Sequence, residues 1–413
     1  MDWDLNPPRL SELNDHDVAG MGSNLKGKRI ALMLTGSIAA YRAPDLIRSL
    51  RREGAEVTVF ASKEGLRYVA REALEWTSLN RVIDEFTADA EHLSDSAPFS
   101  AYLLAPATYN TVNKMAQGIA DSVVTSTLAS ALGKLEHRQT AVLVAPAMHG
   151  SMHNSILTES LKKLHRMGVR VIPPRQENGK NNLPSIENLL AETIRATHES
   201  PLKGVKILIT GGSTPVYIDH IRYITNRFTG ALAIQIAKDA YFQGAQVHLV
   251  LGRDSHAAPP YLDQSLIETY DDYVETIEKL LHHQDFAAGI FTAAVADYRP
   301  ETIFSGKIPS GQLHSIKLTS TEKVIQRIHA DFPDLFMVTF KYEEKVSHEE
   351  LLEIVQARLN QGFPMLVANR GEETGAQGEQ VAWLVEQGIA PQKMVGKPQI
   401  ARTLLSRLAE KLC

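Results

Sequence analysis

Two short turns combine glycine with hydroxyl side chains at places where a parallel sheet could bind phosphate. Gly36-Ser37 follows an apolar run that ends at Leu34, and Gly211-Gly212-Ser213-Thr214 follows one that ends at Thr210. Glycine permits a tight turn there, and the free N–H groups of the next helix favour an anion. Neither turn has the GxGxxG dinucleotide fingerprint. Each therefore predicts either an anion site or an ordinary strand-to-helix connection.

A repeated Ala-Pro-Ala segment provides a second candidate site. The segments YLLAPAT (102–108) and VLVAPAM (142–148) each place Ala-Pro-Ala after an apolar run. Ligands of open parallel sheets bind beyond the carboxyl ends of the strands. Small side chains at two such ends would let a flat ring lie close to the backbone. The pattern therefore indicates a slot for a planar cofactor.

Short apolar runs alternate with longer helical patterns along most of the chain, which predicts βαβ units and parallel sheets. We expect two doubly wound, Rossmann-like α/β domains, the first flavodoxin-like. The predicted strands are Arg29–Leu34, Glu56–Ala61, Ala101–Ala105, Ala141–Ala145 and Val169–Ile172, then Val205–Thr210, Gln246–Leu251, Ala288–Thr292, Phe336–Phe340 and Met365–Ala368. The predicted helices are Ala43–Arg52, Thr108–Gln117, Gly230–Gln243, Asp271–His282, Lys323–His329 and Ser347–Leu359.

The pattern restarts after THESPLKGVK (197–206), so we place the domains at about 28–199 and 200–413, after a polar, flexible leader at 1–27. The net charge of −5 gives no basic field for nucleic acid or an anionic membrane surface. No apolar run approaches the roughly 18 residues of a membrane-spanning helix. Cys413 is the sole cysteine, so we expect no disulfide and no Cys-rich metal site. A cytoplasmic enzyme fits this composition.

Longer segments around the candidate sites carry a family resemblance. GSIAAYRAPDLIRSLRREGAEV (36–57), LLAPATYNTVNKMAQGIAD (103–121) and VAPAM (144–148) resemble the homo-oligomeric flavin-containing cysteine decarboxylases. TGGSTPVYIDHIRYITNRFTG (210–230) and TAAVADYRP (292–300) resemble phosphopantothenate–cysteine ligase. The order of the two halves is similar to that of the bifunctional coenzyme A biosynthesis flavoproteins, over about residues 28–412.

The first half of this resemblance implies an FMN-dependent decarboxylase that oxidises a cysteinyl thiol to a thioaldehyde before CO2 leaves. It implies a catalytic histidine thirteen residues before the Ala-Pro-Ala-Thr strand end, and His92 stands thirteen before Ala105. Histidine can act as a base near neutral pH. By resemblance, the residues near FMN are Gly36, Ser37, Ser62, Ala107, Thr108 and Ser126.

Two departures from the family lie at its substrate positions. His149 follows Met148 where the family has an asparagine that contacts the substrate carboxylate. The lid segment Val171–Leu190 has no cysteine, whereas the family uses a lid cysteine to protonate the enethiolate. We therefore predict that decarboxylation does not run to completion at a normal rate.

The second half of the resemblance implies ligation through an acyl-nucleotide, with Mg2+ and either CTP or ATP. Asn226 matches the family asparagine at the acyl intermediate, and Lys307 stands ten residues after Asp297, as the family's loop lysine does. Pro309 and Ser310 replace further lysines of that loop, which leaves one point charge for the phosphates. The implied substrate-binding residues are Gly211, Gly212, Asp219, Ala293, Asp297, Phe340 and Asn369, with Met148 and His149 in the first half.

Three functions fit these residues. The first is a coenzyme A biosynthesis enzyme acting on 4′-phosphopantothenate, cysteine and a nucleoside triphosphate. The second is a paralogue that performs a related ligation or an oxidative decarboxylation in a specialised pathway. The third is a non-catalytic flavoprotein that serves as a regulatory subunit. The family resemblance also implies a homo-oligomer, either trimer-based or dodecameric, with dimeric ligase domains and FMN at subunit contacts.

Overall fold

The computed structural model of the protein describes residue 6 and residues 11–93, 95–311 and 313–413. The chain divides into two compact units, one ending at His198 and the next beginning at Glu199. Each is a sheet covered by helices, so the predicted α/β class is confirmed. Within the described ranges, no helix is long and apolar enough to cross a membrane.

The first unit is built on a five-stranded parallel sheet with the order β2-β1-β3-β4-β6. The strand interiors are almost continuously buried, as expected for a parallel sheet covered on both faces. The strands are β1 (Arg29–Leu34), β2 (Glu56–Ala61), β3 (Ala101–Ala107), β4 (Ala141–Pro146) and β6 (Arg170–Val171).

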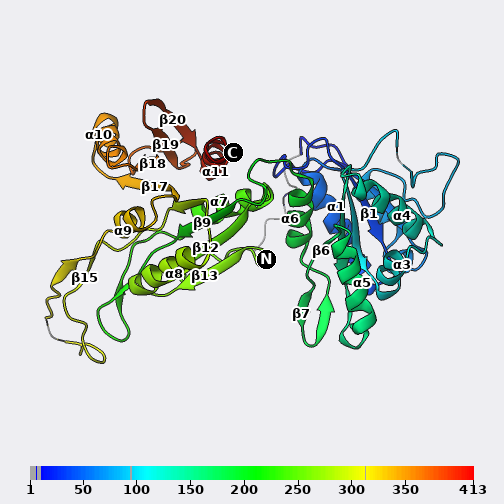
Figure 1. The fold of residues 1–413 in the computed structure, drawn as a ribbon, viewed down its shortest axis with the longest axis horizontal. Helices are drawn as coiled ribbons and strands as arrows, with labels where there is room; N and C mark the ends of the chain where they lie inside the picture. The colour runs from blue at the N-terminus through cyan, green and yellow to red at the C-terminus, as the bar shows by residue number, and fades with distance from the viewer. Residues whose placement is uncertain (1–5, 7–10, 94, 312) are drawn as a thin grey trace. The chain divides into compact units, whose positions relative to one another are not determined.

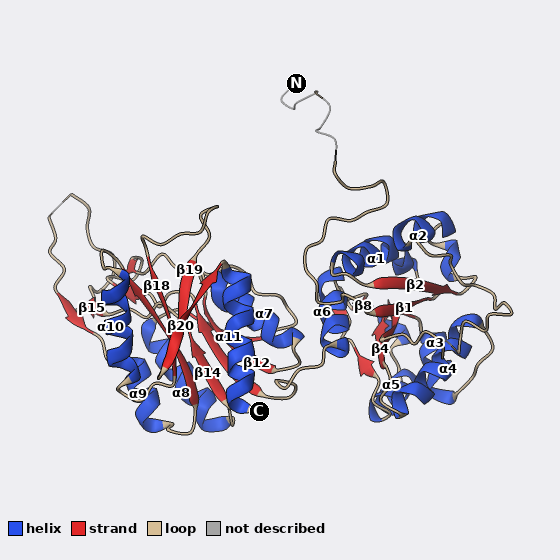
Figure 2. Ribbon diagram, turned by 90° about the horizontal axis from the view of Figure 1, so that it is seen from above, coloured by secondary structure: helices blue, strands red, loops and turns tan. Residues whose placement is uncertain are grey.

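Helices cover both faces of this sheet (Figure 2). Helices α3, α4 and α5 pack on the face that carries Ala31, Met33 and Tyr102, while α1 and α6 lie on the other face. The α-helices are α1 (Ala43–Arg52), α2 (Arg71–Ser78), α3 (Tyr109–Gln117), α4 (Val123–Glu136), α5 (Ser155–Arg166) and α6 (Ile186–Thr197). Short 3-10 helices are η1 (Ile38–Arg42), η2 (Gly65–Arg67) and η3 (Gly150–Met152).

A small antiparallel sheet follows the end of β4. Its strands are β5 (Met148–His149), β7 (Arg175–Glu177) and β8 (Lys180–Asn182), in the order β5-β8-β7. Asn178 and Gly179 both have positive φ, which closes the tight turn between β7 and β8. Figure 1 shows this hairpin projecting from the unit. The pairing places the lid segment beside Met148 and His149.

The segment before β1 packs against the first unit. The Leu25 side chain is fully buried, and its N–H donates to the Glu53 carbonyl at 2.8 Å. The Met21 N–H donates to the Arg52 carbonyl at 3.0 Å. Contact with the unit therefore begins before Lys28, inside the segment expected to be a leader.

The second unit is built on an eight-stranded sheet with the order β13-β12-β9-β14-β17-β18-β19-β20. Its first six strands are parallel, and β19 and β20 add an antiparallel edge that the sequence did not predict. The strands are β9 (Lys206–Gly211), β12 (Gln246–Gly252), β13 (Asp263–Ile267), β14 (Ala288–Phe291), β17 (Phe336–Glu343), β18 (Met365–Arg370), β19 (Val381–Glu386) and β20 (Ile389–Val395).

Two hydrophobic clusters cover the faces of this sheet. One includes α7 and α11, and the other includes α8, α9 and α10. The helices are α7 (Ala231–Phe242), α8 (Tyr270–His283), α9 (Val324–Asp331), α10 (His348–Leu359) and α11 (Lys397–Leu412). Two small antiparallel hairpins leave the sheet edge after β9 and β14: β10 (Val216–Tyr217) with β11 (Tyr223–Ile224), and β15 (Tyr298–Pro300) with β16 (Leu318–Ser320).

Candidate active sites

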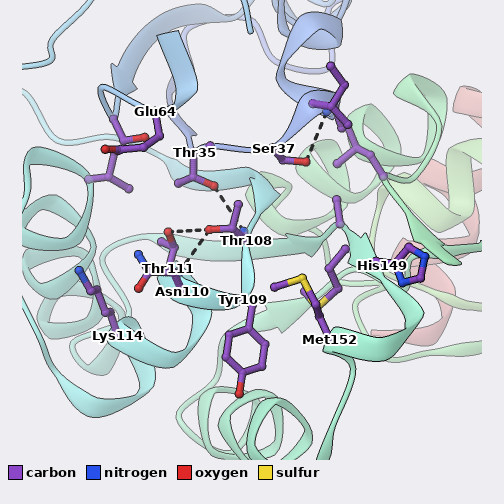
Figure 3. Close-up of a pocket in the computed structure, with 18 of the residues that line it drawn as sticks. Thr35, Ser37, Glu64, Thr108, Tyr109, Asn110, Thr111, Lys114, His149 and Met152 are labelled. Atoms are coloured by element: carbon purple, nitrogen blue, oxygen red, sulfur yellow. Dashed lines mark hydrogen bonds between the residues drawn. The ribbon is translucent and has the colours of Figure 1, made fainter. Parts of the chain in front are cut away.

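The first unit has a cavity of about 850 Å³ beyond the carboxyl ends of its parallel strands. The loops after β1, β2, β3 and β4 all contribute to it. Its lining includes Gly36, Ser37, Ser62, Thr108, Met148 and His149. Figure 3 shows several of these side chains around the cavity.

Threonine hydroxyls tie two strand ends together at this cavity. The Thr35 hydroxyl donates to the Pro106 carbonyl at 2.6 Å, and the Thr108 N–H donates back to the Thr35 hydroxyl at 3.3 Å. Thr108 also caps α3 by accepting from the Thr111 N–H at 3.4 Å, as drawn in Figure 3. Ser37 caps η1 in the same way. Two helix starts with hydroxyl caps therefore face one cavity, which suits a phosphorylated ligand.

Gly36 allows two loops of this cavity to touch. A Cβ atom at Gly36 would lie 2.6 Å from the Glu64 Cβ, in the loop after β2. This is far inside van der Waals contact, so a larger residue would push the β1 and β2 loops apart. The glycine is required by the approach of the Glu64 loop, because its own φ is not in the left-handed region.

The glycine turn of the second unit is closely packed. Gly212 has a φ of +77°, and a Cβ atom there would lie 2.1 Å from the Ser255 hydroxyl. A Cβ atom at Gly230, which precedes α7, would lie 3.2 Å from the Gly212 nitrogen. The Ser255 hydroxyl is shielded from solvent and has no hydrogen-bond partner within the described ranges. The backbone of the glycine turn therefore lies against the Ser255 loop and the start of α7, with no room for a side chain at Gly212.

Hydrogen bonds join this turn to the segment after β14. The Ala294 N–H donates to the Gly212 carbonyl at 2.8 Å, and the Ala296 N–H donates to the Thr214 hydroxyl at 2.8 Å. The exposed Asn226 side chain donates to the Ala294 carbonyl at 3.0 Å. The glycine turn, Asn226 and the Ala293–Asp297 segment are thus held together.

The other predicted residues of this unit include a paired aspartate, an exposed lysine and an asparagine. Asp297 pairs with Lys323, and Lys307 is exposed on the loop that follows β15. Asn369 of β18 stands opposite Tyr342 of β17 in the parallel ladder and is half-buried. Among the described residues, no group of three or more His, Cys, Asp or Glu side chains could hold a metal ion.

Comparisons with known proteins place both units in described families. Residues 20–198 match the family described as Flavoprotein, and residues 202–412 match the DNA/pantothenate metabolism flavoprotein C-terminal domain. The coenzyme A biosynthesis bifunctional protein of Thermococcus kodakarensis is 34% identical over 94% of this chain and 96% of its own. The chain belongs to the bifunctional coenzyme A biosynthesis family.

Further relatives are similar over large parts of the chain. The bifunctional protein of Methanocaldococcus jannaschii is 30% identical over 84% of each chain. The solved DNA/pantothenate metabolism flavoprotein of Streptococcus pneumoniae is 23% identical, covers 50% of this chain and 100% of its own, and has a TM-score of 0.47. This member of the bifunctional family thus joins a decarboxylase-type flavoprotein domain to a ligase-type domain in one chain.

Most flavin-site residues expected in this bifunctional protein lie at or beside the first cavity. Ala107 is fully buried at the end of β3. Ser126 lies on α4, next to Thr125 and one turn after Ser122, and both of these residues line the cavity. The structure does not bring His92 there. The loop before β3 instead packs the His92 ring 4.4 Å from the Phe86 ring, where its Nδ1 is shielded and has no partner in the described part of the chain.

The cavity also contains polar residues that sequence reasoning missed. Lys114 of α3 forms a 2.6 Å ion pair with Asp121, and this hydrogen bond is the leading cause that lowers the pKa of Asp121. The S-x-x-T capping box of Ser122 and Thr125 was a readable signal for the start of α4. Lys180 and Asn181 reach the cavity only because β8 pairs with β5, and no local motif announces that pairing.

Two ligase-domain residues that were expected to bind substrate are buried or half-buried in the structure. Asp219 was expected to bind substrate, but it is fully buried and four internal groups donate to it. Phe340 lies in β17 and packs half-buried against the hydrophobic cluster of α7 and α11.

Proposed function

We propose that the second unit joins 4′-phosphopantothenate to cysteine through an acyl-nucleotide made from CTP or ATP. One observation carries this proposal: Asn226, the Gly211-Gly212 turn and the Ala293–Asp297 segment are hydrogen-bonded into one assembly at the carboxyl edge of a parallel sheet. That edge is where such folds bind nucleotides. The family membership of residues 202–412 supports the same assignment.

The reaction has two balanced steps. A carboxylate oxygen of the acid attacks the α-phosphorus of the nucleotide, and pyrophosphate leaves with the electron pair of the broken P–O bond. The cysteine amine then attacks the acyl carbon, nucleoside monophosphate leaves, and the amine loses a proton to solvent. The exposed ammonium of Lys307 would offset phosphate charge in the first step, and the Asn226 amide would hold the acyl group.

Mg2+ fits this site only as a companion of the nucleotide. No ready cluster of protein ligands exists among the described residues, and the Asp297 carboxylate is paired with Lys323. Mg2+ commonly binds through substrate phosphates with one or two carboxylates. We therefore assign the ion to the triphosphate.

The first unit is proposed to bind FMN. Its cavity of about 850 Å³ combines hydroxyl-capped helix starts with the small side chains of the Ala-Pro-Ala segments. Ser37, Ser62 and Thr108 would hold the phosphorylated end, and the β3 and β4 ends would face the ring. Bound FMN would supply an acceptor for the hydride that is removed from the Cβ atom of the cysteinyl group.

The residues that line this cavity favour a decarboxylation that is not completed. Its lid side is formed by Lys180, Asn181, Asn182 and Leu183, with no thiol among them. His149, where the family has asparagine, is exposed at the cavity and bonds to the Ser151 hydroxyl at 3.1 Å. These substitutions favour a second candidate: a paralogue whose flavoprotein half stops at an enethiol after oxidative decarboxylation.

A homo-oligomer would supply the expected histidine base, which does not lie at the cavity of the first unit within one chain. His92 lies outside the cavity of its own chain, so a base at this position would have to come from a neighbouring copy. Large apolar side chains beside the cavity are exposed, including Ile38 at 69%, Tyr41 at 62% and Met152 at 45%. An apolar patch at the rim of a ligand site is typical of a subunit contact.

The ligase proposal is tested by trapping its intermediate. Purified full-length protein is incubated with α-labelled CTP or ATP, Mg2+ and 4′-phosphopantothenate, without cysteine. We expect a labelled acyl-nucleotide and an equal amount of pyrophosphate, both dependent on the acid. Absence of both products with either nucleotide, in a protein that still binds FMN, would favour the regulatory-subunit function instead.

A further inference from the structure

Asp219 is a buried carboxylate near the ligase site whose two oxygens accept four hydrogen bonds. Its Oδ1 accepts from the N–H groups of Ile221 at 2.8 Å and Arg222 at 2.7 Å. Its Oδ2 accepts from the Arg222 guanidinium at 2.7 Å and from the Ile308 N–H at 3.0 Å. The side chain is 0% exposed. Both oxygens are therefore occupied inside the protein, and neither is available to a substrate.

The Ile308 contact links segments that are far apart in sequence. The Arg222 guanidinium also donates to the Ile308 carbonyl at 3.4 Å, so Asp219 and Arg222 together hold both backbone groups of Ile308. The His220 N–H donates to the Gly306 carbonyl at 3.2 Å. The residues on either side of Lys307 are thus fixed to the turn at 219–222, while the Lys307 side chain remains exposed.

The same turn leads to Asn226. The 219–222 turn joins β10 to β11, and Asn226 follows β11 by two residues. Asn226 is itself anchored to the Ala294 carbonyl. A single buried carboxylate therefore connects the loop that carries Lys307 with the hairpin that carries Asn226.

We propose that Asp219 is a positioning residue that sets the place of Lys307 relative to Asn226 and contacts no substrate. The inference rests on the proposed ligase function, because it acts through the role assigned to Lys307. A point charge stabilises a developing phosphate charge only when it is correctly placed, and a displacement of about 1 Å can cost about 100-fold in rate.

The test is a double-mutant cycle on pyrophosphate release with the full-length protein. Asp219→Asn keeps the shape but turns an amide NH2 toward the donors of Ile308 and Arg222. We expect it to slow release about 10- to 100-fold alone, and by less than about 3-fold when Lys307→Gln is already present. Hydrogen exchange at the Ile308 amide should become faster in Asp219→Asn.

Glu386→Gln is the matched control for lost stability. Glu386 is another buried carboxylate of the second unit, paired with Arg407 and with Lys411 at 2.8 Å. Any effect of Glu386→Gln on the rate should be the same with or without Lys307→Gln. The four hydrogen bonds that Asp219 accepts from Ile221, Arg222 and Ile308 form what we call the Asp219 clasp. If Asp219→Asn does not fold, Arg222→Met is the substitute variant. It removes one donor from this clasp, through a side chain that is 44% exposed.

The outcomes separate the two claims. If Lys307→Gln alone releases pyrophosphate at the parent rate, the proposed role of Lys307 fails. Suppose instead that Lys307→Gln releases pyrophosphate slowly, and that adding Asp219→Asn reduces this rate by the same factor as it does in the parent protein. Asp219 then does not act through Lys307, and the inference is overturned. Unchanged hydrogen exchange at Ile308 in Asp219→Asn would overturn it as well.

Discussion

Lys180 stands directly opposite His149 in the antiparallel pair of β8 and β5, and both residues line the cavity of the flavoprotein unit. Opposite residues in such a pair project from the same face of the sheet, about 5 Å apart at Cβ. A lysine of the cysteine-free lid segment and the imidazole that replaces the family asparagine therefore face the cavity together.

Replacing Lys180 should weaken the binding of an anionic substrate to this cavity. Lys180→Met is expected to raise the Kd of 4′-phosphopantothenoylcysteine about 3- to 10-fold at low salt, because an exposed cation gives a modest, screened attraction. Calorimetry at two salt concentrations measures it. Lys162→Met is the control, since Lys162 is an exposed α5 lysine paired with Glu159 and does not line the cavity. Equal affinities for both variants would contradict this role.

Gly36→Ala should reduce the FMN content of the purified protein. The added Cβ would lie 2.6 Å from the Glu64 Cβ and force the β1 and β2 loops apart. Gly133→Ala on α4 meets nothing within 4 Å, so it should keep the flavin and gain about 0.5–1 kcal/mol of stability. Flavin absorption per protein, released by denaturation, is the measurement. Full flavin in Gly36→Ala would place the cofactor elsewhere.

Replacing the Lys307 ammonium or the Asn226 amide at the ligase site should slow nucleotidyl transfer. Lys307→Gln removes a phosphate contact and Asn226→Asp puts a negative charge beside the acyl group, each expected to cost about 2–4 kcal/mol in the transition state. Pyrophosphate release reports both. Lys317→Gln is the control, because Lys317 is an exposed lysine paired with Glu301 at 2.9 Å. Parent rates in both test variants would show that the site is misassigned.

The Asp219 clasp should weaken in acid. The Ile308 N–H, with the other donors and against the opposing effect of burial, lowers the pKa of Asp219 to about 2. Because this pKa is below the ordinary value of about 3.9, the clasp's stabilisation is complete above that pH and is lost as pH falls toward 2. The Tm advantage of the parent over Asp219→Asn should therefore shrink between about pH 4 and pH 2. A constant advantage across that range would contradict the lowered pKa.

Strong apolar runs made the parallel strands predictable. The observed β1 and β2 end at the residues expected from sequence, Arg29–Leu34 and Glu56–Ala61, because each run is long, buried and closed by small or polar residues. The polar strands β7 and β8 have no such signal, since β8 forms by pairing with β5 and β7 forms by pairing with β8. The antiparallel edge of β19 and β20 was not predicted for a different reason. Strand–helix alternation reveals only parallel strands, and these two strands form a hairpin with no helix between them.

Site residues could be predicted where a local sequence motif fixes their position. They could not be predicted where their position depends on a contact with a distant part of the chain. Ser37 and Thr108 follow strands directly, and the structure puts both on the cavity. Asp219 lies in a recognisable motif, yet its role depends on the amide of Ile308, 89 residues away. The spacing of His92 matched the family, but its loop holds the ring against Phe86 instead of the cavity.

The most direct test of the account is one anaerobic product assay on the full-length protein. It is given 4′-phosphopantothenate, cysteine, Mg2+ and CTP or ATP, and products are identified by mass while the flavin spectrum is recorded. We predict repeated formation of 4′-phosphopantothenoylcysteine with one pyrophosphate each, and no steady formation of 4′-phosphopantetheine. The predicted end state is an enethiol together with flavin that stays reduced. Absence of the ligation product would contradict the ligase assignment, and multiple turnovers to 4′-phosphopantetheine would show that another acid replaces the missing lid thiol.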